Sequence, residues 1–272
     1  MEPALGQPYA ACPDTHVIPT YWPIPNVGVL PMNAFVIKAA EPVLVDTGAA
    51  VLSEQFLDAL GSIIAPADLR WIWLTHEDRD HTGSLRRLLE LAPQIRVITT
   101  YMAIGRMLPD GPFPLDRLHL INPRQTLNVG DRNLLALRPP LFDSPATVGF
   151  VDDRSGMLFS SDCFGAPLPT SGAATAHSAD DLDPPTLAQA QTAWATVDSS
   201  WVTMVDESAL GHALDQIRRV EANAVLSSHL PPIHRSLDRV LDTLRAAPTA
   251  DPVPGVTQVE LETMLSQFEP AR

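Results

Sequence analysis

The first half of the chain alternates short apolar runs with segments whose apolar residues recur at helical spacing. Residues 34–39 and 42–46 are two apolar runs separated by a short polar break, which is typical of a hairpin. Residues 51–64 carry apolar side chains at roughly helical spacing, residues 69–75 form a buried-strand pattern, and residues 84–92 place leucines on one helical face. Short strands are therefore expected to alternate with helices.

The same alternation continues through the second half. Further strands are predicted at 95–100, 133–138, 147–152 and 156–162, and further helices at 184–197, 208–220 and 236–245. A Pro-rich stretch then precedes an amphipathic helix at 257–268, which we expect to pack on the body or on a partner. We predict one domain over residues 1–246, followed by a Pro-rich linker and C-terminal helix over residues 247–272.

An early Pro-rich segment, residues 20–35, is predicted to be a loop that covers the functional site, with Tyr21 or Trp22 in contact with substrate.

Composition bounds the class of protein. A chain of 272 residues with 45% hydrophobic content can bury a sizeable core, and it has no 18-residue apolar run. The net charge of −14 argues against nucleic acid or an anionic membrane surface as a partner. A cytoplasmic location is the default expectation. Cys12 and Cys163 are too few for a disulfide framework or a thiolate zinc site, so a bound metal would have nitrogen and oxygen ligands.

Titratable side chains are concentrated in the segment THEDRDH, which places two histidines and three carboxylates within six residues between a predicted strand and a predicted helix. His76 and Asp78 are two residues apart and can project to one side of an extended turn, whereas the adjacent Asp80 and His81 can face different metal ions. One short loop can therefore serve two ions. The alternative is helix capping plus solvated charge, with Asp80 or Thr82 as the N-cap.

Three further residues lie at the ends of apolar runs. Asp162 and His229 each follow a predicted strand, and Asp143 lies in a Pro-flanked segment between two strands. A carboxylate buried at such a place needs a positive partner. Taken singly, each has a simpler interpretation: Asp162 as a turn residue, His229 as a structural histidine, and Asp143 as an Asx-type turn.

Taken together, these residues resemble the metallo-β-lactamase superfamily over nearly the whole chain. The segments that carry the resemblance are VLVDTG, THEDRDHTG, LFSSDCFG and SSHLPP, in that order. The resemblance implies an α/β fold of four layers, an αβ/βα sandwich of two mixed sheets with helices outside and a binuclear site at one edge. It also implies that Asp162 bridges two metals and that Asp46 organises the loops without binding metal.

The sequence departs from the zinc hydrolases of this superfamily at two positions. Asp78 stands where they have the second histidine of the loop, and it resembles the carboxylate of flavodiiron and related oxygen-binding di-iron proteins. The histidine expected before the bridging aspartate is missing, and the sequence offers Phe142 and Asp143 there, so Asp143 is assigned as its substitute. The candidate metal ligands are His76, Asp78, Asp80, His81, Asp143, Asp162 and His229.

This ligand set is rich in carboxylates and therefore favours two iron ions, with zinc or manganese left open. The main interpretation is a di-iron protein that binds or activates oxygen or a related small oxidant, with Asp80 as the candidate catalytic residue. The alternatives are a zinc- or manganese-dependent hydrolase of an ester, lactone or amide, and a non-catalytic sensor of oxygen or redox state.

The partners expected for this interpretation are oxygen or a small-molecule substrate, with a homodimer left open. Flavodiiron reductases carry a flavodoxin domain after this fold, whereas a Pro-rich stretch and one helix follow here. Electrons would therefore come from a separate donor protein.

Overall fold

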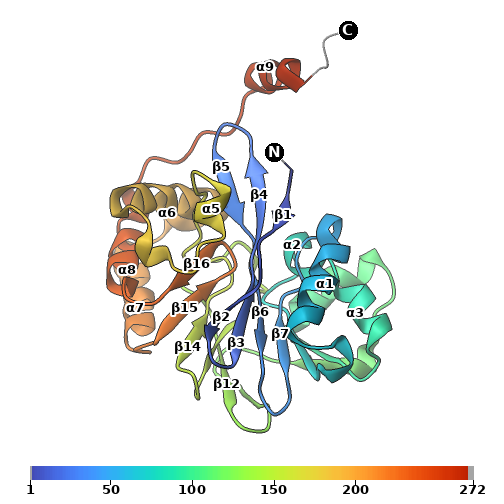
Figure 1. The fold of residues 1–272 in the computed structure, drawn as a ribbon. Coiled ribbons are helices and arrows are strands. Elements are labelled where there is room, and N and C mark those ends of the chain that lie inside the picture. The colour runs from blue at the N-terminus through green and yellow to red at the C-terminus, as the bar shows by residue number, and fades with distance from the viewer. Residues whose placement is uncertain (1, 269–272) are drawn as a thin grey trace.

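Two β-sheets packed face to face form the centre of the molecule, and helices cover both outer surfaces (Figure 1). The structure is a computed structural model and describes residues 2–268. The first sheet has the strand order β10 (Leu118–Leu120), β9 (Arg96–Thr99), β8 (Trp71–Trp73), β7 (Val43–Val45), β6 (Ala34–Ile37), β3 (Thr15–Ile18) and β2 (Tyr9–Cys12). The second has the order β11 (Thr126–Asn128), β12 (Asn133–Leu137), β13 (Gly149–Asp152), β14 (Met157–Phe159), β15 (Ala224–Ser227) and β16 (Leu230–Ile233).

Both sheets are mixed. Strands β7 to β10 run parallel to one another, as do β14 and β15, and the remaining pairs are antiparallel. The outer layer of the first sheet is formed by α1 (Ser53–Ile63), α3 (Leu85–Leu91) and α4 (Tyr101–Met107), and that of the second by α6 (Pro184–Asp198), α7 (Glu207–Arg218) and α8 (Leu237–Arg245). Two single-turn helices, α2 (Arg79–Thr82) and α5 (Ser171–Ala174), lie in the connections.

The core between the sheets is built from large apolar side chains of both. Phe35 and Trp73 come from the first sheet and Phe150 and Phe159 from the second, and all four are almost completely buried. The rings of Phe150 and Phe159 stack with centroids 4.3 Å apart. Burial of each such side chain contributes about 1.5–3 kcal/mol to folding. The αβ/βα sandwich expected from the resemblance is confirmed.

The N-terminal segment corrects one prediction. Residues 20–35, expected to be a loop, contain β4 (Thr20–Ile24) and β5 (Gly28–Pro31). These two strands pair with each other, and β4 also pairs with β1 (Ala4–Leu5), in a small third sheet. Pro23 is tolerated because β1 pairs only with residues 20 and 21, so its missing N–H interrupts no hydrogen bond to β1. Asn26, in the left-handed conformation at φ 60°, makes the hairpin turn.

The C-terminal segment forms the helix expected there. After a short helical turn at Ala247–Thr249, an extended stretch leads to α9 (Gln258–Phe268), which stands away from the sandwich near the tip of the β4–β5 hairpin (Figure 1). Val259, Leu261 and Leu265 on α9 are exposed, so packing of this helix on a partner stays a prediction, as does the domain boundary at 246. Residues 269–272 of the predicted segment lie outside the described residues.

Within residues 2–268, no helix has the length and apolar character needed to cross a bilayer.

Candidate metal centre

The loop that follows β8 is fixed in place by Asp46, which follows β7. Asp46 adopts the left-handed conformation at φ 58°, which is uncommon for a residue other than glycine. Its carboxylate accepts hydrogen bonds of 2.8 Å from both the backbone N–H and the hydroxyl of Thr75, and its Oδ2 lies 2.9 Å from His81 Nδ1. The role that the resemblance implies for Asp46, holding the loops together, agrees with these contacts.

Close packing of the two loops also depends on Gly83. Its N–H donates to the carbonyl of Gly48 across 2.7 Å, and a Cβ atom at residue 83 would come within 2.1 Å of the backbone nitrogen of Ala50. Only glycine allows this approach.

The capping interpretation names Asp80 or Thr82 as the N-cap, but both lie within α2 (Arg79–Thr82), whose N-cap is Asp78. Asp78 occupies the N-cap position of α2, but its side chain accepts no capping hydrogen bond. Glu77 points elsewhere: it pairs with Arg106 and accepts a 3.0 Å hydrogen bond from the Ser144 hydroxyl. Among residues 2–268, no side chain therefore caps α2. Glu77 ties this loop to the loop that carries Asp143.

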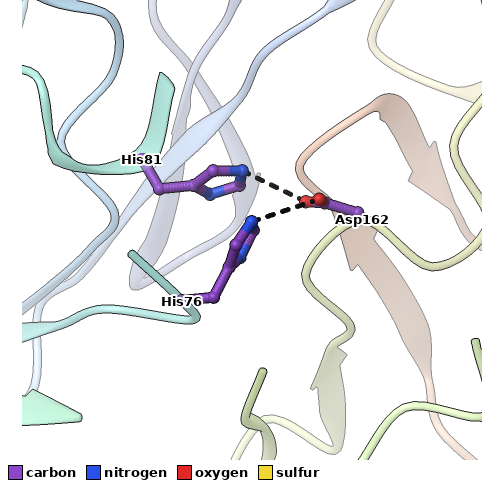
Figure 2. A group of neighbouring side chains, drawn as sticks. All are labelled: His76, His81 and Asp162. Atoms are coloured by element: carbon purple, nitrogen blue, oxygen red, sulfur yellow. Dashed lines mark ion pairs between the residues drawn. The ribbon is translucent and has the colours of Figure 1, made fainter. Parts of the chain in front are cut away.

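Three histidines converge on the carboxylate of Asp162. Its Oδ2 lies 3.4 Å from His76 Nε2, and its Oδ1 lies 3.1 Å from His81 Nε2 and 3.3 Å from His229 Nε2 (Figure 2 shows His76, His81 and Asp162). These residues follow β8, β14 and β15, whose C-terminal ends meet at one edge of the sandwich. Ser161, before Asp162, has φ 54°, so this loop too is held in an uncommon conformation.

The remaining predicted ligands lie around this centre on its more accessible side. Asp143 Oδ2 is 3.7 Å and Asp78 Oδ2 is 4.0 Å from His76 Nε2. Asp80 Oδ2 is 3.5 Å from the Nε2 atoms of both His81 and His229. The structure thus brings all seven sequence-predicted residues together. The histidines and Asp162 are buried, while Asp78, Asp80 and Asp143 are partly exposed.

The histidine rings are oriented so that Nε2 faces the centre. His229 Nδ1 lies 2.7 Å from the carbonyl oxygen of Pro31, and since a carbonyl can only accept, Nδ1 carries the proton. His81 Nδ1 faces the Asp46 carboxylate in the same way, and His76 Nδ1 lies 3.2 Å from the hydroxyl of Ser161. A neutral ring held like this presents an unprotonated Nε2, the atom that binds metals.

A cation fits the donor set. Within the described residues, the Nε2 atoms of His76 and His81 are buried and have no hydrogen-bond partner of acceptable geometry. Burial alone lowers a histidine pKa, but Asp80 and Asp162 outweigh this effect and hold the pKa of His81 well above its usual value. For His229 the same opposition, burial against Asp162, leaves the pKa raised to about 9. The carboxylates therefore favour positive charge here, and a divalent ion supplies it.

Three residues near the centre were missed by the sequence reasoning. Trp194 donates from Nε1 to the carbonyl of Asp162 across 3.2 Å, and Trp201 donates to the carbonyl of Phe142 across 2.8 Å. Burial and the neighbouring Asp162 raise the pKa of Asp198, at the end of α6, to about 8. Asp198 follows Trp194 by four residues, so the sequence places both on one face of α6, but it does not show that this face is directed at Asp162.

A sandwich of this kind, with histidines and carboxylates gathered at one sheet edge, defines the metallo-β-lactamase superfamily. The chain belongs to the ODP family beta lactamase, whose pattern matches residues 30–229. It is 28% identical over 134 residues to the anaerobic nitric oxide reductase flavorubredoxin of Salmonella typhi, a match that covers 49% of this chain and 28% of the relative.

Solved structures show the same fold. Rubredoxin oxygen:oxidoreductase from Desulfovibrio gigas superposes with a TM-score of 0.74 at 17% identity, over 89% of this chain and 61% of that one. The flavodiiron protein from Giardia intestinalis gives 0.77 at 17% identity, over 91% and 60%. The chain thus spans less than a third of that curated relative and about three fifths of these two structures.

Proposed function

We propose that this protein holds two iron ions at the edge of the sandwich and binds or reduces dioxygen or a related small oxidant such as nitric oxide. The observation that carries the proposal is the position of Asp162. Each of its carboxylate oxygens faces a different set of histidines, Oδ2 toward His76 and Oδ1 toward His81 and His229. A carboxylate in this position is suited to bridging two ions.

The other residues divide into two groups around that bridge. The first position would be held by His76, Asp78 and Asp143, and the second by Asp80, His81 and His229, because members of each group offer ligand atoms within 4.8 Å of one another. The first group is the harder of the two, with one imidazole and two carboxylates, and both suit iron.

Reduction of one dioxygen to two waters takes four electrons and four protons. Bound ferrous ions would supply two of these electrons, and a separate donor protein would supply the other two. The residues of this chain would hold the ions, orient the ligand atoms and shield the centre from water. His76, His81 and His229 are closed off from water by the core, so the centre is reached from the side of Asp78, Asp80 and Asp143. Asp80 keeps its proposed catalytic role because it lies at this open side.

The choice of oxidant is supported by the relatives. One is named a nitric oxide reductase and one structure is a rubredoxin oxygen:oxidoreductase. Reduced rubredoxin is therefore a sensible first donor to test. A homodimer and a cytoplasmic location also stay predictions, which sedimentation and cell fractionation test.

The test is metal analysis followed by oxidant consumption. Protein from iron-replete, zinc-poor medium is expected to hold about two irons per chain. With a reduced donor, it should consume oxygen or nitric oxide faster than Asp162→Ala does. Fewer than one ion per chain contradicts the binuclear site. Two zinc ions without iron, together with hydrolysis of an activated ester or lactone, favour the hydrolase instead.

A further inference from the structure

One face of α6 is directed at the loop that carries Asp162. Gln191, almost completely buried, donates from Nε2 to the carbonyl of Phe164 across 3.0 Å, and Trp194 donates to the carbonyl of Asp162 across 3.2 Å. Asp198 follows Trp194 by four residues and Gln191 by seven, so it lies on the same helical face. The helix thus points a carboxylate at the candidate centre.

Asp198 is poorly placed as a structural residue. As the last residue of α6 it lies at the negative end of the helix dipole, where a carboxylate is unfavourable. Its carboxylate accepts a single hydrogen bond within the described residues, from the hydroxyl of Ser199 at 3.3 Å. The helix itself gives no reason for an acidic side chain here.

The carboxylate lies instead within a group of three. Asp143, Asp162 and Asp198 each offer an oxygen within 4.8 Å of the others. In the part of the chain that the structure describes, the ion-pair partners of Asp143 and Asp162 are all histidines. Three carboxylates this close repel one another unless a cation lies between them or one of them takes up a proton.

A separate observation, the state of His76, points to the same place. His76 Nε2 is completely buried and lacks a hydrogen-bond partner of acceptable geometry. It points at the same group, 3.4 Å from Asp162 and 3.7 Å from Asp143. An unpartnered imidazole nitrogen beside converging carboxylate oxygens is a metal-binding arrangement.

Trp201 connects the end of α6 to the loop that carries Asp143. It lies in the helical turn Ser200–Met204 directly after α6, donates to the carbonyl of Phe142 across 2.8 Å and packs on the Phe142 ring with centroids 5.1 Å apart. The loop before Asp143 is thereby fixed to the end of α6. Phe142 offers no ligand atom, so a further ligand for the ion beside Asp143 has to come from another segment.

We propose that Asp198 is a ligand of the ion held by His76, Asp143 and Asp162. The proposal rests on the binuclear centre described above and adds a residue from a different helix to it. It makes the first position a site of one imidazole and several carboxylates, while the second keeps two imidazoles. Because carboxylate ligands suit harder ions, the first position should prefer manganese or iron over zinc.

The first test measures ion binding in Asp198→Asn, which keeps the shape of the side chain and removes its charge. Glu207→Gln, at an exposed position in the first turn of α7, is the matched control. Each protein is stripped with chelator, checked by circular dichroism, titrated with Mn2+ and analysed by electron paramagnetic resonance. Wild type and control should bind two ions with a coupled spectrum. Asp198→Asn should weaken one ion at least about tenfold and show an isolated-ion spectrum.

The outcomes separate this proposal from the proposed function. If wild type binds fewer than two ions, the binuclear centre itself fails. If wild type binds two and Asp198→Asn binds both within twofold of wild type, Asp198 is not a ligand. A crystal structure of wild type soaked in Mn2+ decides the matter without any variant. An Asp198 oxygen within about 2.5 Å of the ion supports the proposal, and a separation beyond about 3.5 Å overturns it.

Discussion

Asp46 Oδ2 lies 2.9 Å from His81 Nδ1, and both side chains are almost completely buried. The carboxylate accepts a hydrogen bond from the Nδ1–H of the neutral ring. The other ring nitrogen, Nε2, then carries no proton and is directed at Asp162. The same carboxylate also holds Thr75, next to His76. One buried aspartate thereby orients the histidine loop from behind.

The first prediction follows from this contact. Asp46→Asn should lower metal affinity about 10- to 100-fold, because an amide group that donates to Nδ1 moves the His81 proton to Nε2. Titration calorimetry with Mn2+ on metal-stripped protein measures the change. Asp58→Asn, at an exposed position on α1, should bind like wild type. Affinity within twofold of wild type in Asp46→Asn would argue against the orienting role.

The second prediction concerns the bridging carboxylate. Asp162→Ala should empty both ion positions, since its two oxygens face different histidines, whereas Asp143→Ala should affect only the position beside His76. Elemental analysis after desalting is the measurement. Complete and equal metal retention in both variants would contradict these roles.

The third prediction concerns metal choice. Asp78→His replaces a carboxylate near His76 with an imidazole, which should shift occupancy from iron toward zinc. Metal content and the ultraviolet-visible spectrum are compared for both proteins purified side by side from mixed-metal medium. Unchanged iron with an unchanged spectrum would show that Asp78 is a solvated loop residue.

The fourth prediction addresses stability away from the centre. Asp180, nearly buried, accepts hydrogen bonds of 3.0 Å from the backbone N–H groups of His234, Arg235 and Ser236. Removing it in Asp180→Ala should lower the free energy of unfolding by about 2–4 kcal/mol. Asp181→Ala, its exposed neighbour, should change it by less than about 0.5 kcal/mol. Urea unfolding at pH 7 measures both.

The same contact predicts a pH dependence. Burial raises the pKa of Asp180, but the hydrogen bonds from Ser236, His234 and Arg235 outweigh it and leave the pKa below its ordinary value. The folded state therefore binds the proton less readily than the unfolded state. The stability that Asp180 contributes is complete above about pH 4 and is lost as the pH falls through its lowered pKa. A difference between wild type and Asp180→Ala that stays constant into acid would contradict this sign.

The sequence predicted most of the strands and helices that carry the centre because the apolar residues of each segment recur with the period of a strand or of a helix. The β4–β5 hairpin was missed because its prolines are typical of loops. A strand can contain Pro23 here because β1 pairs only with residues 20 and 21, which no sequence pattern shows. Ligand candidates at strand ends were identified by residue type. Asp198 was not, because a lone aspartate at a helix end is ordinary until the helix is placed against Asp162.

The hydrogen bond between His229 and the Pro31 carbonyl joins residues 198 positions apart. Closing a chain segment of that length is entropically unfavourable and must be offset by contacts made elsewhere, so the two halves have to dock before His229 can reach His76 and His81. The complete ligand set, which includes His229, is therefore assembled only once the two halves have docked.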